Sequence, residues 1–161
     1  MPKAIFFDRD GTLNNNQNNY YIWKPEDFKL NPGVIETLSE LKEREYLLIV
    51  ITNQGGVAKE EYSMDDVEEI HHHMCVLLQK EGIALDEVYV CPHHQDMEAC
   101  LCRKPLPLLI EKAIASFDID PDESWFVGDS ERDMEAGRAA GLHTLLIEPN
   151  SDLRQVLEKI N

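Results

Sequence analysis

The chain has 161 residues, 43% of them hydrophobic and 29% charged, which is an ordinary balance for a globular protein with one core. The formal net charge of −16 argues against general nucleic-acid binding, because that binding needs a basic face. No apolar run is long enough to cross a bilayer, and the first strand follows Met1 almost directly. We therefore expect no membrane partner, no signal peptide and a cytoplasmic location.

Five short apolar runs predict buried strands, at residues 4–7, 46–51, 88–90, 124–127 and 143–147. Apolar residues at helical spacing, together with capping residues, predict five helices. The first begins at residues 31–33 with Pro32 in its first turn, and the others lie after Ser63, over 106–117, over 131–140 and after Ser151. Strands that alternate with helices imply a Rossmann-like, doubly wound α/β fold, with a parallel sheet of about five strands and helices on both faces. We expect residues 1–161 to form a single domain.

Polar side chains follow four of the predicted strands. They are Asp8 with Asp10, Thr52 with Asn53, Cys91 with His93, and Asp129. The carboxyl ends of parallel strands meet at one edge of a sheet, and ligands of open α/β proteins bind there. The sequence therefore predicts one active site built from these side chains.

The residue types at these strand ends favour a cation and a phosphate. Carboxylates at three positions, with water and phosphate oxygens, are the ligands that Mg²⁺ prefers. Thr52 opens a glycine-rich turn whose hydroxyl and N–H groups suit a phosphate, and Arg103-Lys104 supplies two cations. Each feature also has an ordinary alternative, namely a surface Asp-x-Asp-Gly turn, a simple loop at 52–56 and a surface basic pair.

Taken together, these residues resemble the four motifs of the haloacid dehalogenase superfamily of phosphohydrolases, in the order found in that family. Asp8 and Asp10, within the string DRDGT, match the first motif, Thr52 the second, Lys104 the third, and Asp129 with Asp133 the fourth. The match spans almost the whole chain.

The resemblance implies a role for each matched residue. Asp8 would attack phosphorus, and Asp10 would protonate the leaving group and then activate water. Thr52 and Lys104 would hold the phosphoryl group. The Asp8 and Asp129 carboxylates and the Asp10 main-chain carbonyl would hold Mg²⁺. Asn53 and Arg103 would contact a phosphorylated small-molecule substrate.

Two groups of zinc-ligand residues, CPHH at 91–94 and CLC at 100–102, precede the basic pair. Their spacing matches a four-coordinate zinc site. The ligands that we expect are Cys91, His93, Cys100 and Cys102. His94 is the competing histidine. Because protein atoms would fill all four positions, we expect a structural Zn²⁺ that folds a zinc-binding loop and fixes Arg103 and Lys104 beside it.

The pattern CPHH…CLCRKP resembles two branches of the family, which act on D-glycero-D-manno-heptose 1,7-bisphosphate and on histidinol phosphate. The stretches 21–28 and 52–58 are more similar to the first branch, so we expect release of the 7-phosphate of the heptose bisphosphate. Glu60-Glu61, Ser130 and the Asn-rich run at 14–19 depart from the usual pattern, and histidinol phosphate stays as the alternative. A zinc-stabilised binding module without turnover is the non-enzyme alternative. The points where a cap would insert are short, so we expect no large cap domain, and we expect a monomer.

Two other features predict no chemistry. His71-His72-His73 occupies adjacent helix positions, which do not face one another and cannot form one metal site. We expect Cys75 to be a small core residue.

Overall fold

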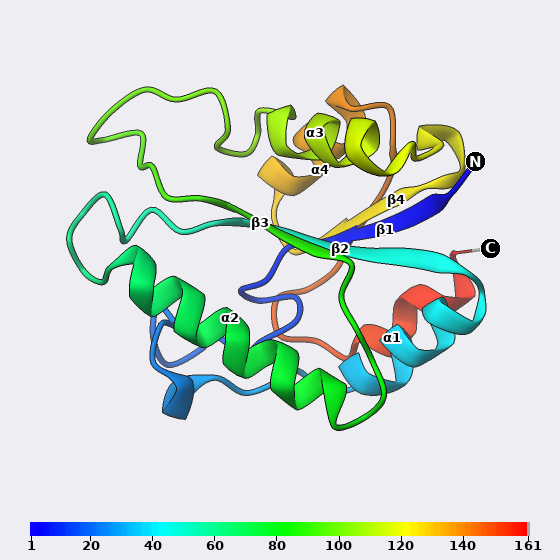
Figure 1. Ribbon diagram of the computed structural model, residues 1–161, viewed down its shortest axis with the longest axis horizontal. Helices are drawn as coiled ribbons and strands as arrows, with labels where there is room; N and C mark the ends of the chain where they lie inside the picture. The colour runs from blue at the N-terminus through cyan, green and yellow to red at the C-terminus, as the bar shows by residue number, and fades with distance from the viewer. Residues whose placement is uncertain (161) are drawn as a thin grey trace.

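Within residues 1–160, which the computed structural model describes, five parallel strands form one sheet in the order β3-β2-β1-β4-β5 (Figure 1). The strands are β1 Lys3–Phe7, β2 Tyr46–Asn53, β3 Glu87–Cys91, β4 Trp125–Gly128 and β5 His143–Leu146. This sheet confirms the predicted α/β class.

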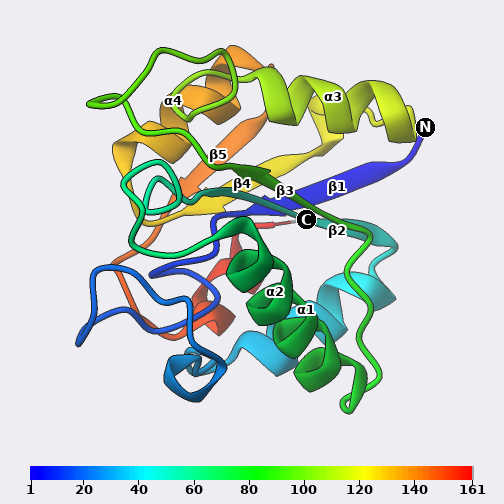
Figure 2. The same ribbon diagram turned by 60° about the vertical axis from the view of Figure 1, so that its left-hand side comes forward.

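Two pairs of helices cover the sheet, one pair on each face (Figures 1 and 2). α1 Val34–Glu43 and α2 Met64–Gln79 lie on one face, and α3 Leu108–Phe117 and α4 Glu131–Ala139 lie on the other. β1 alternates between the two resulting cores, with Ile5 and Phe7 on the α1 and α2 side and Ala4 and Phe6 on the other.

The winding of the chain places the site. From β1 the chain proceeds outward through β2 to β3, then returns across the sheet to β4 and β5, so the direction of winding reverses between β1 and β4. Ligands of open α/β sheets bind at such a reversal, beyond the carboxyl ends of the strands. Asp8 directly follows β1, and Asp129 directly follows β4, so both lie at this point.

Three local predictions need correction. The last helix is a 3₁₀ segment, Leu153–Glu158, and its N-terminal cap is Asp152 instead of Ser151, because the Asp152 carboxylate accepts the Arg154 N–H at 3.0 Å. Cys75 is exposed, because it follows Met74 by one residue and so points about 100° away from the buried face of α2. α1 begins at Val34, after Gly33 in the left-handed conformation (φ 77°), so Pro32 precedes the helix and is not in its first turn.

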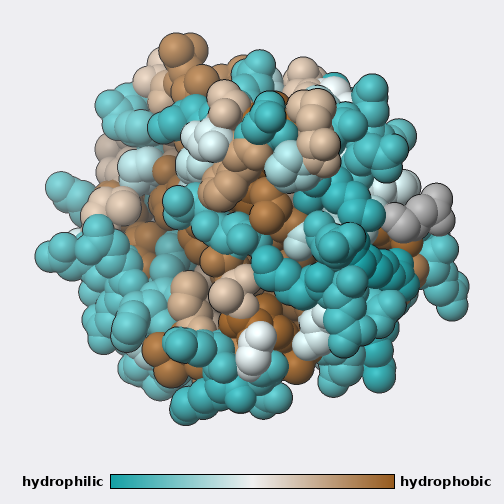
Figure 3. All heavy atoms as spheres, turned by 45° about the vertical axis from the view of Figure 1, so that its right-hand side comes forward, coloured by the Kyte–Doolittle hydropathy of each residue, from teal (hydrophilic) through white to brown (hydrophobic). Residues whose placement is uncertain are grey.

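Hydrophilic side chains surround smaller groups of apolar ones on the face drawn in Figure 3. Within residues 1–160 there is no helix whose length and apolar content would let it span a membrane.

Candidate active site

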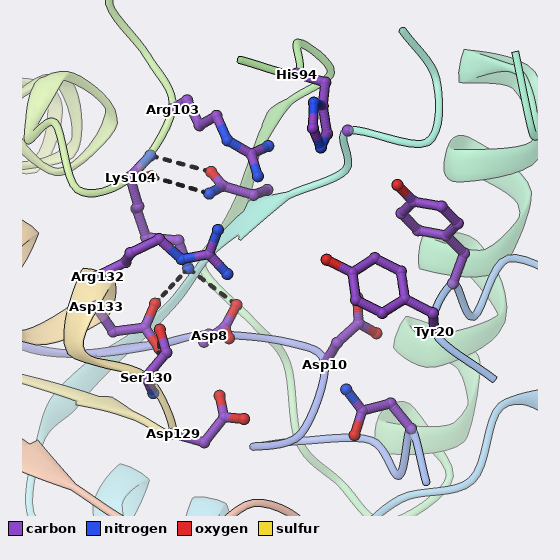
Figure 4. Close-up of a pocket in the computed structure, with 14 residues that line it drawn as sticks. Asp8, Asp10, Tyr20, His94, Arg103, Lys104, Asp129, Ser130, Arg132 and Asp133 are labelled. Atoms are coloured by element: carbon purple, nitrogen blue, oxygen red, sulfur yellow. Dashed lines mark hydrogen bonds and ion pairs between the residues drawn. The ribbon is translucent and has the colours of Figure 1, made fainter. Parts of the chain in front are cut away.

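Lys104 lies in the loop before α3, and its ammonium group is the electrostatic centre of the cavity (Figure 4). The side chain is only 3% exposed, and Nζ donates to Asp8 Oδ1 at 2.9 Å, Asp133 Oδ1 at 2.8 Å and the Ile51 carbonyl at 2.7 Å. A buried ammonium with all three donors used is fixed in position. It therefore offers a fixed positive charge beside Asp8.

Burial and neighbouring charges together raise the pKa values of Asp8, Lys104 and Asp129. Burial, then the charges of Asp133 and Asp129, raise the pKa of Asp8 well above its ordinary range, although Lys104 opposes the shift. Burial disfavours the charge of Lys104, but Asp133 and Asp8 outweigh it and raise its pKa. Burial also raises the pKa of Asp129. Carboxylates gathered in this way need more positive charge than one lysine supplies.

Asp133 lines the cavity, but both of its carboxylate oxygens are engaged by neighbouring side chains. It is buried in the first turn of α4, and its Oδ2 accepts the N–H and hydroxyl of Ser130 at 3.2 Å and 3.1 Å. Its Oδ1 accepts from Lys104, so both oxygens are occupied. A Cβ on Gly128 would lie closer than 3.0 Å to the Asp133 carboxylate, which explains why the last residue of β4 has no side chain.

The donor set fits Mg²⁺. Carboxylate oxygens of Asp8, Asp129 and Asp133 lie within 4.8 Å of one another at the edge of the sheet. Since Asp133 is already occupied, Asp8 and Asp129 are left to receive a hard cation, which prefers oxygen ligands. Gly11 makes room for Asp129, because a Cβ there would lie closer than 3.0 Å to its carboxylate.

Asp10 is held by donors from several segments. Its Oδ1 accepts from Arg9 Nη2 at 2.7 Å and Nε at 3.1 Å and from Asn14 Nδ2 at 3.0 Å, and its Oδ2 accepts from Gln54 Nε2 at 3.1 Å. Arg9 is fully buried and also contacts His71 Nε2 at 3.1 Å. The Asp10 carboxylate is therefore fixed in orientation, and one side of Oδ2 stays open.

The residues after β2 meet the loop that carries Lys104. Asn53 accepts the Lys104 N–H at its Oδ1 (3.1 Å) and donates from Nδ2 to the Lys104 carbonyl (3.2 Å). This side-chain amide fixes the Lys104 backbone, and Asn53 also lines the cavity, so its contact with substrate stays a prediction. Thr52 is buried beside Gln54, whose Nε2 donates to the Thr52 hydroxyl at 2.9 Å.

The predicted zinc ligands converge between β3 and α3. Cys91 Sγ lies 3.0 Å from Cys102 Sγ, 3.8 Å from Cys100 Sγ and 3.6 Å from His93 Nδ1. Tetrahedral zinc with bonds of about 2.3 Å places sulfur ligands about 3.8 Å apart. The Cys91–Cys100 separation matches this value, and the Cys91–Cys102 separation is shorter. Three thiols and one imidazole within 4.8 Å of one another are a donor set that suits Zn²⁺. His94 is outside this cluster; it lines the active-site cavity.

Basic and aromatic side chains form the rim of the cavity. Arg103 Nη1 donates to the His93 carbonyl at 3.0 Å, and the guanidinium faces the cavity (Figure 4). Arg132, from the first turn of α4, lines the same cavity. Tyr20 is 76% exposed and lies on the opposite side of the cavity. The rim can therefore receive an anion on one side and a flat apolar surface on the other.

Comparison with known proteins decides the family. The sequence model of a family described as "Polynucleotide kinase 3 phosphatase" matches residues 3–147. A D-glycero-beta-D-manno-heptose-1,7-bisphosphate 7-phosphatase of Pasteurella multocida is 38% identical over 161 residues, which cover 96% of this chain and 86% of that protein.

Two further proteins add to this likeness. A D-glycero-alpha-D-manno-heptose-1,7-bisphosphate 7-phosphatase of Campylobacter jejuni is 39% identical over 90% of this chain and 81% of that protein. The crystal structure of a D,D-heptose 1.7-bisphosphate phosphatase from B. bronchiseptica, complexed with magnesium and phosphate, has a TM-score of 0.85 and 30% identity, over 98% of this chain and 86% of that chain. The chain belongs to the haloacid dehalogenase superfamily of phosphatases.

The predicted motif residues of this phosphatase do come together. Asp8, Asp10, Asn53, Lys104 and Asp129 all line the same cavity, as does Arg103, while Thr52 is buried next to Asn53 in the chain. The family and the enzyme class that the sequence predicts, a phosphoric monoester hydrolase, are confirmed.

Sequence reasoning missed several residues of the phosphatase site. Arg9, Gln54 and Tyr62 form hydrogen bonds around Asp10, and Arg132 lines the cavity. An arginine between two motif acids is a signal for Arg9. No sequence pattern indicates Tyr62, because its partner Gln54 is found only in the folded loop.

Proposed function

We propose that this phosphatase removes the 7-phosphate of D-glycero-D-manno-heptose 1,7-bisphosphate through an aspartyl-phosphate formed on Asp8. The observation that carries the reaction is the contact of Asp8 with the buried Lys104 ammonium, at 2.9 Å, beside Asp129. The substrate comes from the relatives, whose names specify the 7-phosphatase activity at 38% and 39% identity.

In the proposed first step, an Asp8 carboxylate oxygen attacks phosphorus and the bond to the sugar oxygen breaks. As the Asp8 carboxylate becomes an ester, the Lys104 N–H that it accepted turns to an oxygen of the phosphoryl group, which the Thr52 hydroxyl also holds. Asp10 gives a proton to the departing sugar oxygen. In the second step Asp10 takes a proton from the water that hydrolyses the aspartyl-phosphate. Asn53 and Asp133 keep Lys104 in place throughout.

The two metals have different proposed roles. The Asp8 and Asp129 carboxylates and the Asp10 main-chain carbonyl would hold Mg²⁺, which supplies charge neutralisation between the Asp8 carboxylate and the phosphate. Cys91, His93, Cys100 and Cys102 would hold a structural Zn²⁺. That ion would keep the loop folded and Arg103 and Lys104 in place.

The arrangement of the rim agrees with an extended substrate that carries two phosphate groups. Arg103 and Arg132 can receive a second phosphate without displacing Lys104 from Asp8. We propose that the phosphatase acts as a single domain without a cap, so that the sugar lies in an open site.

A phosphate-release screen tests the substrate. The purified protein is supplied with Mg²⁺ and with the two anomers of the heptose 1,7-bisphosphate, heptose 7-phosphate or histidinol phosphate. We expect kcat/KM for one bisphosphate anomer to exceed that for histidinol phosphate at least about tenfold, with heptose 1-phosphate as the product. A preference for histidinol phosphate would overturn the proposed substrate.

The nucleophile is tested with Asp8→Asn. An asparagine oxygen can still accept from Lys104, so we expect a folded protein whose phosphate release falls at least about 10³-fold. Asp118→Asn, at the C-terminal end of α3, makes the same chemical change away from the cavity and should leave activity unchanged. Wild-type rates in Asp8→Asn would refute its role as nucleophile.

A further inference from the structure

Gln54 is buried, only 1% exposed, and does not line the cavity, yet it joins two groups that do the chemistry. Its Nε2 donates to Thr52 Oγ1 at 2.9 Å and to Asp10 Oδ2 at 3.1 Å. A primary amide carries two N–H groups on one nitrogen, so both contacts are made at once. Gln54 therefore ties the phosphate-binding hydroxyl to the acid at a fixed separation.

Tyr62 determines the orientation of the Gln54 side-chain amide, that is, which side its oxygen and its nitrogen occupy. The Tyr62 hydroxyl donates to Gln54 Oε1 at 2.5 Å, so the Gln54 nitrogen must face Thr52 and Asp10. Burial and the charge of Asp10 raise the pKa of Tyr62, which keeps this hydroxyl protonated.

The Tyr62 ring is itself held in place by packing. It stacks on Trp23 with ring centroids 6.0 Å apart and meets Tyr21 edge-on. A Cβ on Gly56 would lie closer than 3.0 Å to the Tyr62 ring, so the ring can occupy this position only because residue 56 is glycine. The amide of Gln54 is thus oriented by a side chain that cannot easily turn away.

The donors around Asp10 identify the oxygen that carries its proton. Oδ1 already accepts three hydrogen bonds, two from Arg9 and one from Asn14. Oδ2 accepts only the one from Gln54, which leaves it a free lone pair. A proton on Asp10 therefore belongs on Oδ2, the oxygen that Gln54 holds.

We propose that Gln54, oriented by Tyr62, is a positioning residue for the departure of the sugar. It sets the distance between the Thr52 hydroxyl, which binds the phosphoryl group, and Asp10 Oδ2, which protonates the sugar oxygen. As the bond from Asp8 to phosphorus forms, the bond from phosphorus to the sugar oxygen breaks. Its electron pair stays on the sugar oxygen, which takes the proton from Asp10 Oδ2 and leaves as an alcohol. The inference rests on the proposed function.

The test compares leaving groups. A sugar alkoxide needs the proton from Asp10, whereas p-nitrophenolate leaves without help. We expect Tyr62→Phe to lower the ratio of kcat/KM for heptose 1,7-bisphosphate to that for p-nitrophenyl phosphate about tenfold. A purely structural defect would lower both values equally. Tyr89→Phe, on β3, removes a hydroxyl outside the site and should leave the ratio unchanged.

A double-mutant cycle tests whether Tyr62 acts through Gln54. If it does, Tyr62→Phe added to Gln54→Met should change the ratio less than about twofold beyond Gln54→Met alone. Circular dichroism checks that the variants fold; should Gln54→Met not fold, the Tyr62→Phe ratio decides alone. An unchanged ratio in Tyr62→Phe, or additive losses in the cycle, would overturn the inference. The proposed function is judged separately, by wild-type turnover and its loss in Asp8→Asn.

Discussion

At the scale of single residues, the site depends on space as much as on charge. Asp129 can approach the β1 loop only because residue 11 has no side chain, and the backbone of Gly11 is left-handed, with φ 84°. Any other residue at position 11 would have a strained left-handed backbone, and its Cβ would collide with the Asp129 carboxylate. The two effects can be separated, because Gly82 has a similar φ of 77° and no atom lies within 4 Å of the position that a Cβ would take there.

We expect Gly11→Ala and Gly82→Ala each to lose about 1 kcal/mol of stability from the left-handed backbone. Only Gly11→Ala should displace Asp129, and we expect it to raise the Mg²⁺ concentration for half-maximal phosphate release at least about tenfold. Thermal unfolding measures the first effect and a Mg²⁺ titration the second. The same Mg²⁺ requirement in both variants would show that Asp129 is not a metal ligand.

At the scale of elements, the loop between β3 and α3 carries the cations of the site but little apolar packing. Met97, Leu101 and Leu106 in this loop are all exposed, so its own side chains form no core. The cysteines and histidine that gather at its base are therefore its main means of holding a shape. Because Arg103 and Lys104 directly follow Cys102, the order of this loop decides the charge next to Asp8.

Cys102→Ser should remove one zinc ligand, so we expect the zinc content to fall from about one equivalent to near zero. The unfolding temperature and the activity should fall with it. Cys75→Ser is the matched control, because Cys75 is exposed on α2 and belongs to no such cluster within residues 1–160. Elemental analysis of both proteins is the measurement, and full zinc content in Cys102→Ser would exclude this cysteine as a ligand.

The elements were predictable to the extent that local patterns determine them. The apolar run 46–51 is short and rich in β-branched residues, which favours a buried strand, and it lies in β2. The Ser63 capping box begins α2 as expected, with the Asp66 N–H bonded to Ser63 Oγ at 3.1 Å. The last segment was misjudged because Asp152 competes with Ser151 as a cap. The support around Asp10 was not predictable, because Arg9 meets His71 across 62 residues of chain. Sequence spacing alone cannot report such a contact.

At the scale of the whole molecule, the 31 acidic residues outnumber the 15 basic ones about two to one. Three of the basic residues, Arg103, Lys104 and Arg132, nevertheless line one cavity. An anionic, phosphorylated substrate would be repelled by most of this surface and attracted by that cavity. Interior charge also affects the stability of the fold, since α2 meets the end of β1 through the contact between His71 and the fully buried Arg9.

That contact predicts how the stability of the fold depends on pH. Burial, then the charge of Arg9, lowers the pKa of His71 from 6.5 to about 3, so the folded protein keeps the imidazole neutral. Below pH 6.5 the unfolded chain binds a proton that the folded chain does not, so stability falls as the pH falls toward 3. Between pH 7 and 5 the loss from this group alone is about 2 kcal/mol. Urea unfolding at both pH values should show a smaller acid loss in His71→Gln than in the wild type, since glutamine can accept from Arg9 without titrating. His72→Gln, exposed on the same helix, should behave like the wild type, and equal acid losses in both variants would show that His71 titrates normally in the folded protein.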